Sequence, residues 1–136
     1  MKWGYGLSNG KLVFNARSET AAEKALFADG MRQRRCLIPA DSYFEWEHSG
    51  KEKQKYEIAP EGASGFCLAG IYRMEGRQAV FSILTREPAD SISFIHDRMP
   101  VILPTAVAAD WLNPRQDGMG ILTFSVRDLC YRQCDT

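Results

Sequence analysis

The chain has 136 residues, 45% hydrophobic and 25% charged, which is the length and composition of one globular domain with a single core. Lys plus Arg and Asp plus Glu number 17 each, which excludes a global positive field that would recruit nucleic acid. Any anion-binding site must therefore be local. No apolar run approaches the span of a bilayer, and Met1–Gly4 lacks the apolar region of a signal peptide, so we expect a cytoplasmic protein without membrane contact.

Cysteine spacing gives little support for a metal site. The four cysteines form no CxxC pair, which favours free thiols packed as small hydrophobic side chains; they are Cys36, Cys67, Cys130 and Cys134. Cys130 and Cys134 would share one face of a helix and could then hold a metal with two further ligands. The only imidazoles are His48 and His96, so we expect no metal and no cofactor.

The first third predicts a turn, a strand and a helix. Asn9-Gly10 is a turn signal in a glycine-rich opening, and Leu12–Phe14 is a short strand candidate. A helix is predicted from near Ser18, with acidic residues in its first turns and alanines on its buried face. Gly30 is predicted to end this helix as its C-cap.

The middle of the chain predicts closely spaced strands. Residues 42–48 alternate, with Phe44 and Trp46 on one face and Tyr43, Glu45 and Glu47 on the other. Residues 53–58, 66–74 and 78–85 are predicted as further strands, separated by Glu61-Gly62 and Glu75-Gly76 turns. This pattern favours an antiparallel meander or a partly closed barrel.

The last third predicts short helices between strands. Residues 88–95 form a short helix with Ile92 and Ile95 facing inward, and Pro100 leads into a strand that ends at Leu103. A helix over 104–112, a polar loop over 113–120 and a last strand over 121–126 follow. The fold class expected is a single α+β domain, mostly antiparallel, with a small, partly open barrel-like sheet and a few short helices.

Three stretches carry candidate chemistry. His96 lies between an apolar run and the pair Asp97-Arg98, which suits proton transfer beside a bound anion; the alternative is a histidine satisfied by local hydrogen bonds. Asn15 and Arg17 share one side if extended, and Arg binds phosphate bidentately; the alternative is a turn with a solvated arginine. Aromatic neighbours of Glu45 would raise its pKa; the alternative is a glutamate on a wet strand face.

Four blocks of the sequence together resemble the SOS response-associated peptidase (SRAP) family. They are Asn15-Ala16-Arg17-Ser18-Glu19-Thr20, Arg35-Cys36-Leu37-Ile38-Pro39-Ala40-Asp41-Ser42-Tyr43-Phe44-Glu45-Trp46, Ile83-Leu84-Thr85 and Ile95-His96-Asp97-Arg98-Met99-Pro100-Val101-Ile102-Leu103. Trp3-Gly4 resembles the tryptophan-glycine that precedes them. The likeness runs in order from about residue 3 to Leu112, and residues 113–136 match weakly.

This resemblance implies a strand-rich domain with a cleft for single-stranded DNA that carries an abasic site. In the family, an N-terminal cysteine attacks the ring-opened sugar, its amine forms a Schiff base and its thiol closes a thiazolidine. By the same resemblance Asn15 positions the amine, Glu45 shuttles protons and His96 assists ring opening. The residues implied to contact DNA are Trp3, Arg17, Thr85 and Arg98. A location in the bacterial cytosol or nucleoid follows.

The chain departs from the family pattern at its start. The family opens with Met-Cys-Gly-Arg and several strands before its tryptophan-glycine, whereas Met1-Lys2 directly precedes Trp3 here, so we expect a truncated domain. Covalent chemistry of this type needs an amine and a thiol on one residue, which only a terminal cysteine supplies. Within this sequence, Lys2 or the Met1 amine would support at most weak lyase chemistry. The alternative functions are a non-catalytic single-stranded DNA binding module and an inactive shortened relative; the sequence predicts no oligomeric state.

Overall fold

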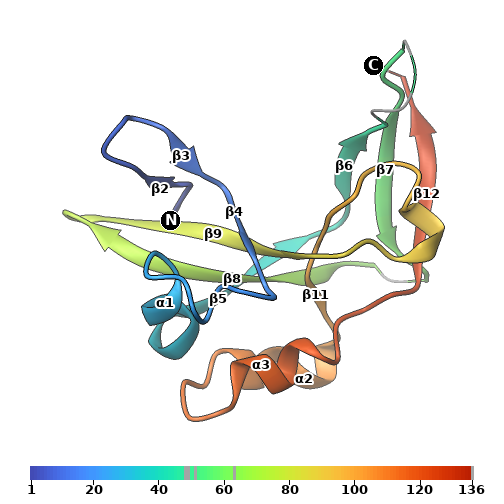
Figure 1. Ribbon diagram of the computed structural model, residues 1–136. Coiled ribbons are helices and arrows are strands. Elements are labelled where there is room, and N and C mark those ends of the chain that lie inside the picture. The colour runs from blue at the N-terminus through green and yellow to red at the C-terminus, as the bar shows by residue number, and fades with distance from the viewer. Residues whose placement is uncertain (48–49, 51, 63, 136) are drawn as a thin grey trace.

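A long antiparallel hairpin forms the centre of the molecule. The computed structural model describes residues 1–47, 50, 52–62 and 64–135, and Figure 1 shows this hairpin as its longest ribbon. Strand β8 (Phe66–Glu75) pairs with β9 (Gln78–Arg86) from Glu75↔Gln78 to Gly70↔Ile83. Gly76, with φ of 62°, makes the predicted turn between them, because a positive φ favours glycine. Both strand predictions and the turn are confirmed.

The N-terminal strands flank β9 in parallel, which the predicted antiparallel meander did not include. Strands β1 (Lys2–Trp3) and β4 (Asn15–Arg17) pair with β9 one after the other. The hairpin of β2 (Tyr5–Gly6) and β3 (Leu12–Val13) connects them and turns at Gly10, where φ is 84°. The chain therefore leaves the sheet after β1 and returns to the same edge in the same direction.

The segment after His96 lies where β8 and β9 separate. Strand β10 (Met99–Pro100) pairs with β9, and β11 (Ile102–Leu103) pairs with β8. Val101 joins the two strands, since its N–H donates to Leu84 O at 2.8 Å and its carbonyl accepts from Ala69 N at 3.0 Å. Strand β5 (Arg35–Ala40) pairs with β8 on the same sheet. This arrangement fixes the backbone on which Arg98 is held.

A second sheet stands at one end of the hairpin, upright in Figure 1, and consists of β6 (Tyr43–Trp46), β7 (Lys55–Pro60) and β12 (Leu129–Cys134). The predicted alternation in β6 is confirmed, because Phe44 and Trp46 are exposed while Tyr43 and Glu45 are half-buried. The expected helical placement of Cys130 and Cys134 is wrong. Both lie on β12, which pairs with β7 along six residues from Leu129↔Pro60 to Cys134↔Lys55.

The helices are short. They are α1 (Ala28–Gln33), the 3-10 helix η1 (Asp90–Ile92), α2 (Thr105–Trp111) and α3 (Gly118–Leu122). Helices α1 and α2 pack on the sheet of the β8–β9 hairpin and α3 packs on α2, whereas η1 packs on β12 of the second sheet. The prediction of one helix from Ser18 to a cap at Gly30 is wrong. Residues 18–27 form successive turns, and Gly30 lies inside α1. A Cβ at Gly30 would meet Ile71 Cβ at 3.0 Å, so this position in the helix favours glycine.

The predicted strand over 121–126 is also wrong. Residues 118–122 form α3, whose N-terminus is capped by the Asp117 carboxylate accepting from Met119 N–H at 3.2 Å. Ile121 is buried within α3 at 7% exposure, whereas Phe124, beyond the helix, is 61% exposed.

Two apolar clusters hold the sheets and helices together. One lies under α1, α2 and α3 and includes Trp111, Ile71 and Leu84; the other lies between η1 and the second sheet. Ile92 and Ile95 belong to the second cluster at 2% and 1% exposure, as predicted. The fold is α+β with mostly antiparallel, open sheets in the described part of the chain, which confirms the predicted class. No described helix is long and apolar enough to cross a membrane.

Candidate nucleic-acid interface

Strand β4 presents Asn15 and Arg17 on one exposed face. Ala16 between them is 1% exposed, so the two polar side chains point away from the core, as the sequence predicts for an extended segment. The parallel register places Asn15 opposite Ile83 and Arg17 opposite Thr85 of β9. The structure therefore brings two predicted DNA-contacting residues, Arg17 and Thr85, to neighbouring strands.

Arg98 joins this group from the other side of β9. Its guanidinium donates to the Thr85 hydroxyl oxygen from Nε at 3.3 Å and from Nη2 at 3.1 Å. The same guanidinium donates to both carboxylate oxygens of Glu19 at 2.7 Å each, a bidentate pair. These hydrogen bonds lower the pKa of Glu19 to about 2 and raise the pKa of Arg98. Arg98 is therefore held in place by an acidic residue that precedes it by 79 positions.

His96 is half-buried in the turn before Arg98. Its Nδ1 accepts a hydrogen bond from the backbone N–H of Arg98 at 3.1 Å, and an Asp97 carboxylate oxygen lies 3.2 Å from the same nitrogen. The first contact uses the lone pair of a neutral ring, whereas the second uses a proton on Nδ1. The imidazole therefore has a local partner in either protonation state, which suits a group that exchanges protons.

Glu45 lies on the face of the second sheet that η1 and the His96 segment cover. It pairs with Tyr56 on β7, so the two side chains share one face, and the Tyr56 ring makes an edge contact with Phe94 at 5.5 Å. The half-buried Glu45 carboxylate accepts from Trp46 N–H at 3.3 Å. Burial, with the nearby Glu45 charge, raises the pKa of Tyr43, whose buried hydroxyl has no hydrogen-bond partner among the described residues.

Trp3 forms an exposed aromatic surface at the edge of the sheet. It is 46% exposed, and its ring lies parallel to Phe81 with a centroid distance of 6.3 Å and an interplanar angle of 8°. The indole N–H donates to Phe14 O at 2.8 Å, which fixes the ring orientation. An exposed, immobilised indole of this kind is suited to stacking with an unpaired base.

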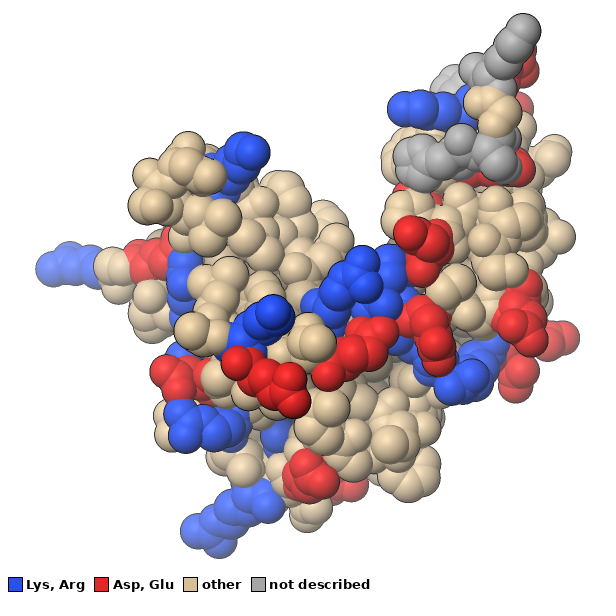
Figure 2. All heavy atoms as spheres, viewed as in Figure 1, with Lys and Arg blue, Asp and Glu red and all other residues tan. Residues whose placement is uncertain are grey.

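The surface is hollowed between the two arms of the molecule. Figure 2 shows a recess between the β2–β3 hairpin and the second sheet, with Lys and Arg atoms gathered at its floor and Asp and Glu atoms along one border. The arginines that the structure groups around the end of β9 are Arg17, Arg86 and Arg98, with Glu19 and Glu87 as their acidic neighbours. Three arginines therefore lie near two glutamates at this end of β9, in a chain of zero net charge.

Sequence reasoning named Asn15, Arg17, Thr85 and Arg98 but gave no role to Glu19. The available signal was its position two residues after Arg17 in the quoted Asn15–Thr20 block. Its partner could not be identified, because the contact to Arg98 depends on the crossing of distant segments.

No group of three or more His, Cys, Asp or Glu side chains among the described residues could hold a metal ion, and His48 lies outside those residues.

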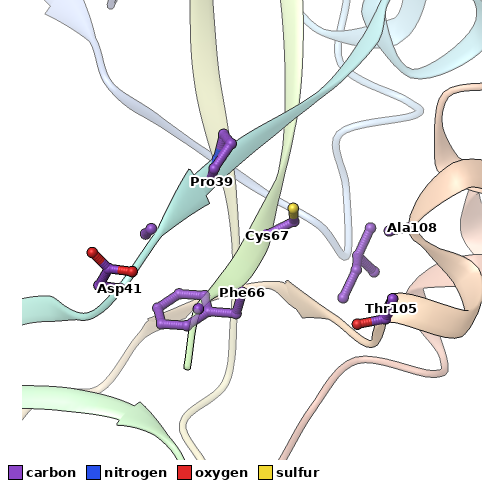
Figure 3. Close-up of a pocket in the computed structure, with 9 residues that line it drawn as sticks. Pro39, Asp41, Phe66, Cys67, Thr105 and Ala108 are labelled. Atoms are coloured by element: carbon purple, nitrogen blue, oxygen red, sulfur yellow. The ribbon is translucent and has the colours of Figure 1, made fainter. Parts of the chain in front are cut away.

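A pocket of about 430 Å³ lies between β5, β8 and α2. Asp41, Cys67 and Thr105 are among its lining residues, as Figure 3 shows. No predicted site residue lines this pocket, so it is separate from the recess at the end of β9.

Comparison with known proteins identifies the fold family. The family model described as SOS response associated peptidase (SRAP) matches residues 1–128. The chain belongs to the SRAP family. The abasic site processing protein YobE of Bacillus subtilis is 39% identical over 112 residues, covering 78% of this chain and 51% of that protein. The abasic site processing protein YedK of Escherichia coli is 30% identical over 122 residues, covering 85% and 55%.

Two solved structures share the fold described above. A protein from Bacteroides thetaiotaomicron superposes with a TM-score of 0.79 at 30% identity, covering 89% of this chain and 58% of that one. A phage-related protein from Bordetella bronchiseptica, at 24% identity, superposes with a TM-score of 0.81 and covers 98% and 70%. The chain spans about half the length of the curated relatives it matches.

Proposed function

We propose that this SRAP chain takes part in abasic-site processing by holding a single DNA strand in the recess between its two arms. The proposal depends on one observation above all: at the end of β9, Arg17 lies opposite Thr85 in the β4–β9 register, and Arg98 donates to the Thr85 hydroxyl oxygen. Guanidinium and hydroxyl donors in this arrangement are suited to consecutive phosphates of one strand. The abasic substrate class is inferred from the named relatives.

In this proposal, Glu45 and His96 act as proton-transfer groups and Asn15 orients an amine. His96 is tied to the phosphate-binding group through the Arg98 N–H, at 3.1 Å. Proton transfer assists both sugar ring opening and imine formation, because each step moves a proton onto or off an oxygen. Trp3 supplies a ring for stacking with a base next to the lesion.

The thiol step of the covalent reaction lies outside what these residues supply. The four cysteines of the chain are internal, at positions 36, 67, 130 and 134, so none carries a free α-amine beside its thiol. What the described residues supply is strand binding and proton transfer.

Fluorescence anisotropy with a labelled single-stranded oligonucleotide that contains an abasic-site analogue tests the proposal. Arg17→Gln should weaken binding to every sequence and reduce the slope of log affinity against log salt by about one, because one phosphate contact is lost. Arg77→Gln is the matched control, since Arg77 is exposed in the distant β8–β9 turn. Equal affinity of the wild-type, Arg17→Gln and Arg77→Gln proteins would contradict the proposed interface.

A further inference from the structure

A pocket of about 200 Å³ lies at the C-terminal end of β9, between the end of β4 and the turn after α3. Arg86 and Arg127 line it together with the Ser125 hydroxyl group. Arg86 lies beside Arg17 and Arg98 at the end of β9, but neither it nor the other two residues has a role in the strand binding proposed above. At about 30 Å³ for each water molecule, the space is that of about seven waters. The pocket is therefore large enough for a tetrahedral oxyanion and part of its hydration shell.

Arg86 is a buried cation whose hydrogen bonds go to neutral acceptors. The residue is 8% exposed; its Nε donates to Glu87 O at 3.1 Å, and its Nη1 donates to Ser125 Oγ. Its ion pair with the Glu87 carboxylate spans 3.9 Å. A guanidinium removed from water needs a charged partner to offset its lost hydration, and these contacts supply one only at long range.

Comparison with Arg35 shows that the situation of Arg86 is unusual in this chain. Arg35 is equally buried at 7% exposure, but four backbone carbonyls surround its guanidinium, from Met31, Trp111, Asn113 and Gln116. Its donors are engaged by the protein itself, which is the pattern of a structural arginine. Arg86 keeps donor capacity that its protein contacts do not use, since a guanidinium carries five N–H groups.

The charges around the pocket favour an anion. Burial is the largest cause that lowers the pKa of Arg86, and the positive charge of Arg127 is the next. The carboxylates of Glu87 and Glu19 also line the pocket and act on the pKa of Arg86 in the opposite direction, but Glu19 is engaged in its bidentate pair with Arg98. The Glu87 side chain is 73% exposed and is free to turn toward solvent. Two neighbouring guanidinium groups therefore repel each other, and an anion between them would relieve that repulsion.

We propose that this pocket binds a phosphate group that carries two negative charges, with Arg86 and Arg127 as its charged donors. Ser125 Oγ accepts from Arg86, so its own proton is available for a phosphate oxygen. A phosphomonoester is mostly a dianion at neutral pH, because its second pKa is about 6, whereas an internal phosphodiester carries one charge. The group is that of inorganic phosphate or of a phosphorylated strand end, and the second source rests on the proposed DNA binding.

The test measures binding of inorganic phosphate by calorimetry, and of short single-stranded oligonucleotides that carry a 5′-phosphate, a 3′-phosphate or hydroxyl groups at both ends. Arg127→Gln is the principal variant, because Arg127 is exposed and its loss leaves the core intact. Arg115→Gln removes the same charge from an exposed loop as a control. Ser125→Ala and Arg86→Met are second variants, and their folding is checked by circular dichroism.

The expected result is phosphate binding by the wild-type and Arg115→Gln proteins, with a loss of about tenfold in Arg127→Gln, the effect of one charge-assisted contact. If a terminal phosphate strengthens oligonucleotide binding in the wild-type protein but not in Arg127→Gln, the ligand of the pocket is the phosphate of a strand end. Binding of inorganic phosphate alone identifies the free ion, and both results support the pocket. Absence of phosphate binding, or equal binding by Arg127→Gln, overturns it. Binding of the hydroxyl-ended oligonucleotide reports separately on the proposed function.

Discussion

The Arg98 guanidinium and the Glu19 carboxylate form a bidentate ion pair, with both N···O distances at 2.7 Å, at the edge of the proposed DNA-binding recess. Glu19 is half-exposed, whereas the Arg98 side chain is only 17% exposed. A phosphate that approaches Arg98 must therefore displace Glu19 or share the guanidinium with it. The ion pair keeps the Arg98 guanidinium positioned in the free protein. It also weakens the electrostatic attraction of Arg98 for a negatively charged ligand, because the Glu19 carboxylate lies beside the guanidinium.

Replacement of Glu19 should strengthen DNA binding. In Glu19→Gln, Arg98 loses its competing anion while the hydrogen bonds to Thr85 Oγ1 remain. We expect affinity for a single-stranded oligonucleotide to rise several-fold at low salt, with a steeper salt dependence, measured by anisotropy. Glu23→Gln, at an exposed position in the same segment, is the control for removal of one negative charge. A weaker or unchanged affinity in Glu19→Gln relative to Glu23→Gln would show that Arg98 does not contact the strand.

The same ion pair should make stability depend on acid pH. The pKa of Glu19 is lowered from 4.5 to about 2, chiefly by the Arg98 hydrogen bonds, so folding favours the ionised carboxylate. Its stabilisation is complete above pH 4.5 and is lost as the pH falls through about 2. Because Glu19 is half-exposed, solvent screening limits the contribution to about 1 kcal/mol.

Urea unfolding at several pH values measures this contribution. The difference in unfolding free energy between wild type and Glu19→Gln should be constant from pH 7 to 5 and vanish near pH 2. A difference that stays constant down to pH 2 would mean that the ion pair contributes nothing to stability.

Substitution of the two proton-transfer candidates should separate catalysis from binding. Glu45→Gln and His96→Gln should slow adduct formation with an abasic oligonucleotide by about 100-fold, the lower range for acid–base groups, while affinity stays within about twofold. Borohydride trapping of the imine, followed on a gel, measures the rate. Unchanged trapping in both variants would favour the non-catalytic binding module, and no trapped adduct with the wild-type protein would rule out amine chemistry in this chain.

Arg35 should be essential for stability although it lies outside the proposed site. Its guanidinium donates to backbone carbonyls of Met31, Trp111, Asn113 and Gln116 and lies 4.9 Å from the centroid of the Trp111 ring. In Arg35→Met the buried carbonyls lose their donors, so we expect destabilisation by about 3 kcal/mol in urea unfolding.

Arg32→Met is the matched control for Arg35→Met, since the Arg32 side chain is 68% exposed in its pair with Asp29. It should change stability by less than about 0.5 kcal/mol. A similar loss in both variants would show that the carbonyl contacts of Arg35 are not the source of the effect.

Local pattern was sufficient for β6, β8 and β9, for the turn between β8 and β9, and for the motif residues. The alternation in β6 and the turn at Gly76 follow from side-chain period and glycine φ, which are properties of neighbouring residues. Asn15 and Arg17 share a face for the same reason, because extended residues alternate. The family resemblance was likewise carried by contiguous blocks, and the SRAP match confirms it.

Only the tertiary structure decided how distant segments meet. A glycine near the end of a helical pattern predicts a C-cap, but Gly30 lies within α1, where it allows the close approach of Ile71, a residue 41 positions away. The sequence did not predict strand β12, because its partner β7 is about 70 residues away. Pairing with a distant strand produces no pattern of polar and apolar residues within β12 that would mark it as a strand. The Arg98–Glu19 pair and the Arg86 pocket arise in the same way, since burial and charge depend on neighbours that only chain folding brings together.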